Sequence, residues 1–312
     1  MRQTLQIISL ALAIVLGSGC VATHQTNRDR IAEKSAPYEM FAFQRSYPDT
    51  VFDWRGWRKM LQSVKTQAAA QARISTDCTS NSALWTEQGP GNVAGRCNTI
   101  AVHPNDENTL LAGFSTGGIF KSTDGGVNWH PVFDEQVDLS IGDITYDPSN
   151  PDIVYAGTGD PNVPSIAYNG NGIYKSSDGG ETWNYLALAD KGIISKITVH
   201  PTNPMHLVVA SMGNPYIRDA ERGIFVSKDG GTTWVKTLYV SNQAGASDLV
   251  MAPSSPNIMY ASFWDRIRNN QESILSGPSA KVFKSDDGGI SWIQLSNGLP
   301  TGRLGRTGLA VS

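Results

Sequence analysis

The sequence predicts an all-β fold, a β-propeller of four-stranded blades preceded by a short helical lead-in. Glycine accounts for 31 of the 312 residues and charged residues for only 17%. This composition favours tight turns and short strands over long charged helices. A motif ending in tryptophan also recurs four times, with its aspartates at positions 124, 178, 229 and 287. Periods near 50 residues are typical of propellers and solenoids.

The repeated motif reads Ser-x-Asp-Gly-Gly-x-x-Trp, and its copies occupy 121–129, 175–183, 226–234 and 284–292. Upstream of each copy, an alternating apolar strand runs into a proline turn and a second strand follows. The third strand ends in the motif, and we expect the fourth to begin at the tryptophan. Four short strands joined by Pro and Gly turns predict one propeller blade per repeat.

The motif resembles the Asp-box, or BNR repeat, of sialidases, sortilins and related propellers. Residues 84–312 most resemble the sortilin-type propellers of exported bacterial proteins, which are often described as glycosyl hydrolase-like. The resemblance implies that the Asp and Ser side chains bind N–H groups of the turn, that the glycines adopt positive φ, and that the Trp packs between blades. A calcium role is disfavoured because the loop lacks alternating oxygen ligands. The residues given this structural role are Asp124, Trp129, Asp178, Trp183, Asp229, Trp234, Asp287 and Trp292.

Both ends of the repeat region carry partial repeats. A lone fourth strand is expected near Trp85, and 305–312 repeats the 95–102 opening. The sequence therefore predicts four complete blades with orphan terminal strands, as the front part of a longer protein or as an incomplete propeller.

Residues 1–19 resemble an export signal, with a basic start, an apolar run over 5–16 and a small-residue segment ending at Cys20. The apolar run is too short to span a bilayer. The pattern resembles a bacterial lipoprotein signal in which Cys20 is acylated, although Gly17 stands where the family usually has Leu. Plain secretion is the alternative. Both place the mature chain outside the cytoplasm, in the cell envelope or secreted.

A tether is expected over 20–50 and an amphipathic helix over 51–80. Apolar residues at helical spacing alternate with Arg58, Lys59 and Lys65. The apolar set is Trp54, Trp57, Leu61, Val64 and Ala68. The helix could pack against the main domain or lie on a membrane surface.

Besides Cys20 the chain has only Cys78 and Cys97. In an oxidising compartment the two could pair, and two independent thiols are the alternative. No metal-ligand spacing, phosphate loop or nucleophile elbow is present, so neither a metal nor a cofactor is predicted. The net charge of −3 without a basic block argues against nucleic acid as the main partner.

The loops between second and third strands should share one end of the blades, and three of them are long: 159–172, 212–223 and 264–281. They combine aromatics with amides, carboxylates and arginines, as a sugar or peptide site does. Solvated loops without a ligand are the alternative. The candidate ligand-binding residues are Asp160, Tyr168, Asn171, Tyr216, Arg218, Asp219, Arg222, Trp264, Asp265 and Arg266.

Glycoside hydrolysis needs two carboxyl groups about 5 to 10 Å apart, and Asp160 and Asp265 are weak catalytic candidates. Residues 111–118 resemble xyloglucan-cleaving two-propeller enzymes, but Ser115 stands where those enzymes have a catalytic Asp. The Arg, Tyr and Glu set of sialidases cannot be assigned. We therefore expect a binding platform for a glycan or protein ligand, tied to a membrane by its lipidated N-terminus. A glycoside hydrolase is the alternative, and an assembly chaperone like the plant photosystem II assembly propeller is a third.

Overall fold

The computed structural model describes residues 54–74, 95–164, 168–269 and 272–311. The predicted signal, the tether, Cys20, Cys78 and the strand near Trp85 lie outside these residues. The helical lead-in is α3 (Trp54–Ile74), within the expected range 51–80. In the described part of the chain, no helix is long and apolar enough to cross a membrane.

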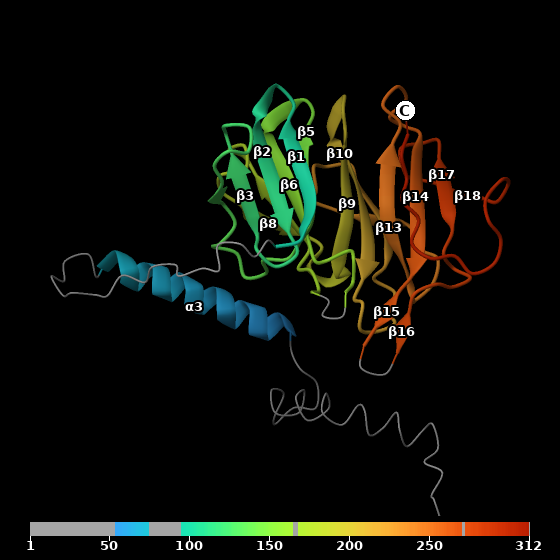
Figure 1. The fold of residues 1–312 in the computed structure, drawn as a ribbon, viewed down its shortest axis with the longest axis horizontal. Helices are drawn as coiled ribbons and strands as arrows, with labels where there is room; N and C mark the ends of the chain where they lie inside the picture. The colour runs from blue at the N-terminus through green and yellow to red at the C-terminus, as the bar shows by residue number, and fades with distance from the viewer. Residues whose placement is uncertain (1–53, 75–94, 165–167, 270–271, 312) are drawn as a thin grey trace, which may run out of the picture. The chain divides into compact units, whose positions relative to one another are not determined.

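The remainder forms four antiparallel four-stranded sheets in chain order, so the predicted blades are confirmed (Figure 1). Blade 1 contains β1 (Cys97–His103), β2 (Asp106–Phe114), β3 (Ile119–Ser122) and β4 (His130–Pro131). Blade 2 contains β5 (Ile141–Asp147), β6 (Asn150–Thr158), β7 (Ile173–Ser176) and β8 (Asn184–Ala187). Blade 3 contains β9 (Ile193–His200), β10 (Asn203–Gly213), β11 (Gly223–Ser227) and β12 (Val235–Leu238).

Blade 4 contains β13 (Ala244–Met251), β14 (Met259–Asp265), β17 (Val282–Ser285) and β18 (Ile293–Leu295). Its long loop forms a hairpin of β15 (Ile267–Arg268) and β16 (Ser273–Ile274). A short 3-10 helix, η2 (Ala189–Lys191), precedes blade 3. Each fourth strand begins one residue after the Asp-box tryptophan instead of at it, because the indole N–H still bonds the turn, as from Trp234 to the Gly231 carbonyl at 2.9 Å.

The core lies between successive blades, whose first strands β1, β5, β9 and β13 run side by side. Leu111 and Ile119 of blade 1 belong to the first buried cluster, together with Ile144, Val154 and Tyr174 of blade 2. Similar clusters join blade 2 to blade 3 and blade 3 to blade 4. Each sheet therefore buries its apolar faces against neighbouring sheets, which is how propeller blades form a core.

The first face of blade 1 differs from its equivalents. Ile100 and Val102 on β1 are 62% and 52% exposed, whereas Ile144 and Tyr146, which hold the same register on β5, are buried. Blade 1 covers Ile144 and Tyr146 of blade 2. No described residues cover Ile100 and Val102 of blade 1 to the same extent.

Residues 305–311 carry no assigned strand, but Leu309 takes the place of a first strand beside blade 4. Its N–H donates to Asp248 Oδ2 at 2.9 Å. The same bond joins Ile197 N–H to Asp143 Oδ2, also at 2.9 Å, between blades 3 and 2. This segment therefore lies where the sequence predicts an orphan first strand.

The Asp-box turns show the hydrogen bonds implied by the resemblance. In blade 2, Ser176 Oγ accepts the Gly180 N–H at 2.9 Å and donates to Asp178 Oδ1 at 2.7 Å. Asp178 Oδ1 accepts the Thr182 N–H at 2.9 Å, and Oδ2 accepts the Thr182 hydroxyl at 2.6 Å. Equivalent bonds recur in the other three motifs. Both glycines of each motif have positive φ, with values of 68° and 90° in this turn.

The Asp-box turns also touch the preceding blade. Lys121 of blade 1 donates to the Gly179 carbonyl at 3.0 Å, and His206 of blade 3 bonds the Gly288 carbonyl at 2.8 Å. Because a carbonyl only accepts, the His206 Nε2 carries the proton in this bond. The motif thus fixes its own turn and helps to align adjacent blades.

Cys97 is a free and exposed thiol, and its Sγ lies 3.3 Å from the Thr99 carbonyl. Its predicted partner Cys78 is outside the described residues, so the pairing stays a prediction.

Replacing Ser176 with Ala should destabilise the fold by about 1–3 kcal/mol, because the buried Gly180 N–H loses its acceptor. The adjacent Ser177 is exposed, so Ser177→Ala is a matched control that should change stability by less than about 0.5 kcal/mol. Urea denaturation measures both. Equal effects of the two substitutions would contradict the structural role of Ser176.

Acid should remove stability that the Asp-box carboxylates provide. The backbone N–H and side-chain amide of Asn128 lower the pKa of Asp124 from 3.8 to about 2. The hydroxyl and N–H of Thr233 lower the pKa of Asp229 to about 2. A carboxyl pKa that is lower in the folded state stabilises the fold above the unfolded value, and this stability is lost as the pH falls from about 4 to about 2.

Urea midpoints measured across that range should therefore fall with pH, and Asp229→Asn should reduce the slope because one titrating group is gone. A slope in Asp229→Asn identical to that of the unmodified chain would show that Asp229 does not titrate as described.

Candidate functional site

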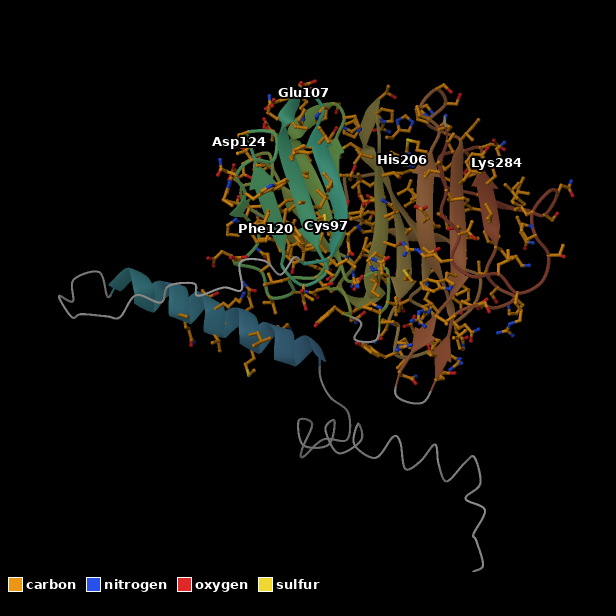
Figure 2. All side chains as sticks on the ribbon, in the orientation of Figure 1. Cys97, Glu107, Phe120, Asp124, His206 and Lys284 are labelled. Carbon is orange, nitrogen blue, oxygen red and sulfur yellow. The ribbon has the colours of Figure 1, made fainter. Side chains whose placement is uncertain are left out.

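The long loops that follow β6, β10 and β14 lie at one end of the blades, which we call the loop end. The Asp-box turns lie at the other end, where Figure 2 shows Asp124 near Glu107, at the start of β2. The hairpin β15–β16 marks the loop end in Figure 1. The antiparallel strand order produces this separation, because β2-to-β3 connections and β3-to-β4 turns fall at opposite ends of a sheet.

Arg222 holds the loop of blade 3 in shape. Its side chain is buried, and its guanidinium donates to the carbonyl of Met212 at 2.7 Å, to that of Ile217 at 2.7 Å and to that of Asn214. It also reaches the Arg266 carbonyl of blade 4 at 3.4 Å. Burial lowers the pKa of Arg222. This arginine therefore satisfies backbone carbonyls that would otherwise be buried without donors.

Arg266 joins the loop of blade 4 to that of blade 2. Its Nη2 donates to the Val163 carbonyl at 2.6 Å, and its Nη1 donates to the Ile274 carbonyl at 2.9 Å. The guanidinium lies 5.2 Å from the ring centre of Trp264. Val163 has a φ of 41°, unusual for a β-branched residue. Arg266 therefore bonds the carbonyl of a residue with a strained backbone.

An apolar cluster underlies these arginines. Val163, Ile193, Met212 and Trp264 are buried together, and Tyr216 packs against them partly buried. The Trp264 indole donates to the Leu275 carbonyl at 2.8 Å. Residues from the loops of blades 2 and 3 and from the ends of β9, β10 and β14 thus share one small core, separate from the clusters between the sheets.

Asp265 is fully buried and holds the end of the blade 4 loop. Its Oδ2 accepts the N–H groups of Ser279 at 2.7 Å and Ala280 at 2.9 Å, and its Oδ1 accepts the Gln243 amide at 3.0 Å. Gly277 approaches this carboxylate so closely that a Cβ would lie 2.2 Å from Oδ2. Its hydrogen bonds give this carboxylate a structural role.

Asp160 is also fully buried. It forms an ion pair with Arg96, accepts the Asn98 amide at 3.4 Å, and accepts the Asn162 N–H at 3.1 Å. Arg306 in turn donates to the Asn162 side chain. The Asp160 cluster therefore connects the start of blade 1 to the loop of blade 2 and to the segment after blade 4.

The sequence analysis did not single out Arg96, Asn98, Asn162 or Arg306 as site residues. One signal was available, because Gly95-Arg96 and Gly305-Arg306 open the two partial copies of the same repeat. Both arginines reach the loop of blade 2, one through Asp160 and the other through Asn162.

A second charged group lies along the first strands. Lys196 of β9 donates to Asp143 of β5 at 3.1 Å, and Thr99 of β1 donates to the same carboxylate at 3.2 Å. Burial raises the pKa of Asp143, and the Asp143 carboxylate raises the pKa of Lys196. This group joins blades 1, 2 and 3, and the sequence pattern gave no indication of it.

Other predicted residues are more accessible. Arg218 of blade 3 pairs with Glu272 of blade 4 through its two terminal nitrogens, with Nη1 donating to Oε1 and Nη2 donating to Oε2 at 2.9 Å. The hydrogen bond from Arg218 lowers the pKa of Glu272. Asp219 accepts the Glu221 N–H at 2.9 Å within its turn. Asn171 is half-buried and lies 3.3 Å from the Tyr174 hydroxyl.

The exposed part of the loop end includes Tyr168, Ile217 and Leu275, one residue from each long loop. A backbone bond from Asp160 N to Tyr168 O at 3.0 Å closes the blade 2 loop, and one from Arg268 N to Pro215 O at 2.7 Å joins the loops of blades 4 and 3. An aromatic ring, two aliphatic side chains and the Arg218–Glu272 ion pair at the same end of the blades can provide stacking and polar contacts to a ligand.

The structure thus gives Asp160, Arg222, Trp264, Asp265 and Arg266 protein partners in buried positions. Tyr168 and Arg218 are exposed, and their predicted contact with a ligand is not tested. Ser115, which stands where the enzymes that residues 111–118 resemble have a catalytic aspartate, is buried, and its N–H donates to the Arg96 carbonyl at 3.0 Å. No cluster of three or more metal-ligating side chains occurs among the described residues.

Comparison with known proteins finds similarity to xyloglucanases. The chain is 26% identical over 232 residues to xyloglucanase Xgh74A of Acetivibrio thermocellus, covering 65% of this chain and 26% of that protein. It is 24% identical over 267 residues to a xyloglucanase of Paenibacillus sp, covering 77% of this chain and 25% of that protein. The chain therefore spans about a quarter of the length of these relatives. No family model matches.

Among solved structures, the crystal structure of an ancestral GH74 enzyme is similar with a TM-score of 0.52 and 19% identity, over 69% of this chain and 26% of that one. At this identity the likeness establishes the fold alone. The four sheets thus have the fold of the propeller blades in that structure.

The two arginines of the blade 3 loop should differ sharply in their contribution to stability. Arg222→Ala should cost at least about 3 kcal/mol, because several buried carbonyls lose their donor. Arg218→Ala should cost less than about 1 kcal/mol, because its ion pair with Glu272 is exposed to solvent. Thermal and urea denaturation of both variants provides the measurement. A small effect of Arg222→Ala would contradict its structural role.

Proposed function

We propose that this protein is an exported propeller whose loop end binds a glycan, and that acylation of Cys20 anchors it to a membrane. The observation that carries the proposal is the contrast between the loop end's surface and its interior. Tyr168, Ile217 and Leu275 are exposed there, on loops that buried arginines hold in place.

The burial and hydrogen bonding of the two candidate catalytic carboxylates support binding without hydrolysis. A glycosidase needs an acid and a base or nucleophile that both reach the scissile bond. Asp160 and Asp265 are fully buried and engaged by protein donors. Their structural bonds leave them poorly suited to protonating a bound sugar.

The choice of a glycan is supported by the relatives, which are named xyloglucanases. A binding surface can persist when a catalytic group is replaced, and Ser115 stands where the xyloglucan-cleaving enzymes that residues 111–118 resemble have a catalytic aspartate. Xyloglucan oligosaccharides are therefore the first ligands to test, and a protein ligand is the alternative within the same proposal.

Hydrolysis is the second candidate function, favoured by the same similarity to xyloglucanases over 65% of this chain. Asp160→Asn and Asp265→Asn distinguish the two functions. If either variant keeps its thermal midpoint but loses measurable product formation from xyloglucan, the protein is a hydrolase and binding alone is the wrong description.

Calorimetric titration with xyloglucan oligosaccharides should show binding that Tyr168→Ala weakens about two- to tenfold, because an aromatic contact contributes about 0.5–1.5 kcal/mol. Met205→Ala is the control, since Met205 is exposed at the start of β10, at the Asp-box end. Equal binding by Tyr168→Ala and Met205→Ala would show that the ligand does not bind at Tyr168 on the loop end. A pull-down that recovers one specific protein while no glycan binds would favour the protein ligand.

The anchor is tested separately by labelling growing cells with a fatty-acid analogue. We expect incorporation into the unmodified chain and none into Cys20→Ala. Incorporation that survives Cys20→Ala would exclude this cysteine as the acylation site.

A further inference from the structure

The helix α3 differs in charge from the rest of the chain. Its 21 residues include five cations, Arg55, Arg58, Lys59, Lys65 and Arg73, and no Asp or Glu. The full chain has a net charge of −3. A large share of its positive charge is therefore concentrated in one short helix.

On the apolar face of this helix, Leu61 is half-buried, whereas Met60 and Val64 are exposed. Met60 is 46% exposed and Val64, one turn later, is 53% exposed. Amphipathic helices of globular proteins normally bury this face. At about 100° per residue, the sequence places Trp57 on the same side of the helix as Met60 and Val64. Tryptophan favours the boundary between apolar and aqueous phases.

The contact that α3 makes with blade 1 leaves this face uncovered. Lys65 donates to the carbonyls of Asp134 and Gln136 at 2.9 and 2.7 Å. Consecutive helical residues are about 100° apart, so Lys65 points away from the direction of Val64. The contact is polar and does not bury Met60 or Val64.

We propose that α3 lies on the surface of an anionic lipid bilayer, with its Met60 and Val64 face at the acyl boundary and its cations toward the headgroups. Interfacial helices combine a basic polar face with an apolar face that includes Trp or Leu. A second copy of the chain is disfavoured as the occupant, because pairing would bring two helices of five positive charges together. This inference goes beyond the proposed glycan binding and does not depend on it.

Co-sedimentation with lipid vesicles tests the proposal. The mature chain, residues 20–312, carries Cys20→Ala so that no acyl chain contributes to binding. We expect it to bind vesicles containing one-third phosphatidylglycerol in phosphatidylcholine, to bind phosphatidylcholine alone at least tenfold more weakly, and to lose binding as the salt concentration rises.

Three variants locate the contact. Val64→Asp and the double variant Arg58→Glu/Lys59→Glu should each weaken binding at least tenfold. Val64→Gln, which suits a helix better than Asp, should weaken it less. Val235→Asp is the matched control, because Val235 is 65% exposed on β12 of blade 3, and it should bind as the unmodified chain does.

Three results would overturn the proposal. The first is unchanged binding of Val64→Asp and of the charge-reversal variant. The second is a dimer in light scattering that Val64→Asp converts to a monomer, which would make a second copy the occupant. The third is a clear fall in thermal midpoint for both Val64→Asp and Val64→Gln, which would show that the protein itself covers this face. The assay contains no glycan, so its outcome is independent of the proposed function.

Discussion

The fold depends on the closed hydrogen-bond network of the Asp-box turn, repeated in each of the four blades. Its serine accepts a glycine N–H, and its aspartate accepts the N–H and side chain of the residue four positions later. The network fixes the turn that joins the third and fourth strands. Because the turn also reaches the preceding blade, as at Gly179 and Gly288, local geometry and blade packing support each other.

Because the Asp-box turns fix one end of each blade, the loops at the opposite end can differ in length from blade to blade. The Asp-box end is nearly the same in every blade, whereas the loops at the loop end grow from a few residues in blade 1 to a hairpin-bearing loop in blade 4. Long loops normally leave backbone groups unpaired when they pack together. Here Arg222, Arg266 and Asp265 supply the missing partners, so the loops can form a fixed surface.

Sequence reasoning succeeded where the determinants are local. The Asp-box hydrogen bonds, the positive φ of its glycines and the four-strand repeat all follow from residues within about 50 positions of one another. The helix was also predictable, since its apolar spacing lies within 21 residues. The predicted start of each fourth strand was one residue too early. The indole of residues such as Trp234 still bonds the turn at that position.

Site reasoning from the sequence was weaker, because residue type does not reveal burial. Asp160 and Asp265 look like catalytic carboxylates in a loop, yet each is enclosed by donors from distant segments. The charged group of Thr99, Asp143 and Lys196 joins three blades and carries no sequence motif.

The sequence by itself determined the four-stranded blade, its Asp-box turn and the number of blades, because the residues that specify each blade lie within one repeat. Only the tertiary structure decided which polar loop residues are structural and which face solvent. The physical reason is that burial depends on how neighbouring blades bring remote segments together. Arg266 of blade 4 meets Val163 of blade 2 more than 100 positions away, and no local pattern encodes that distance.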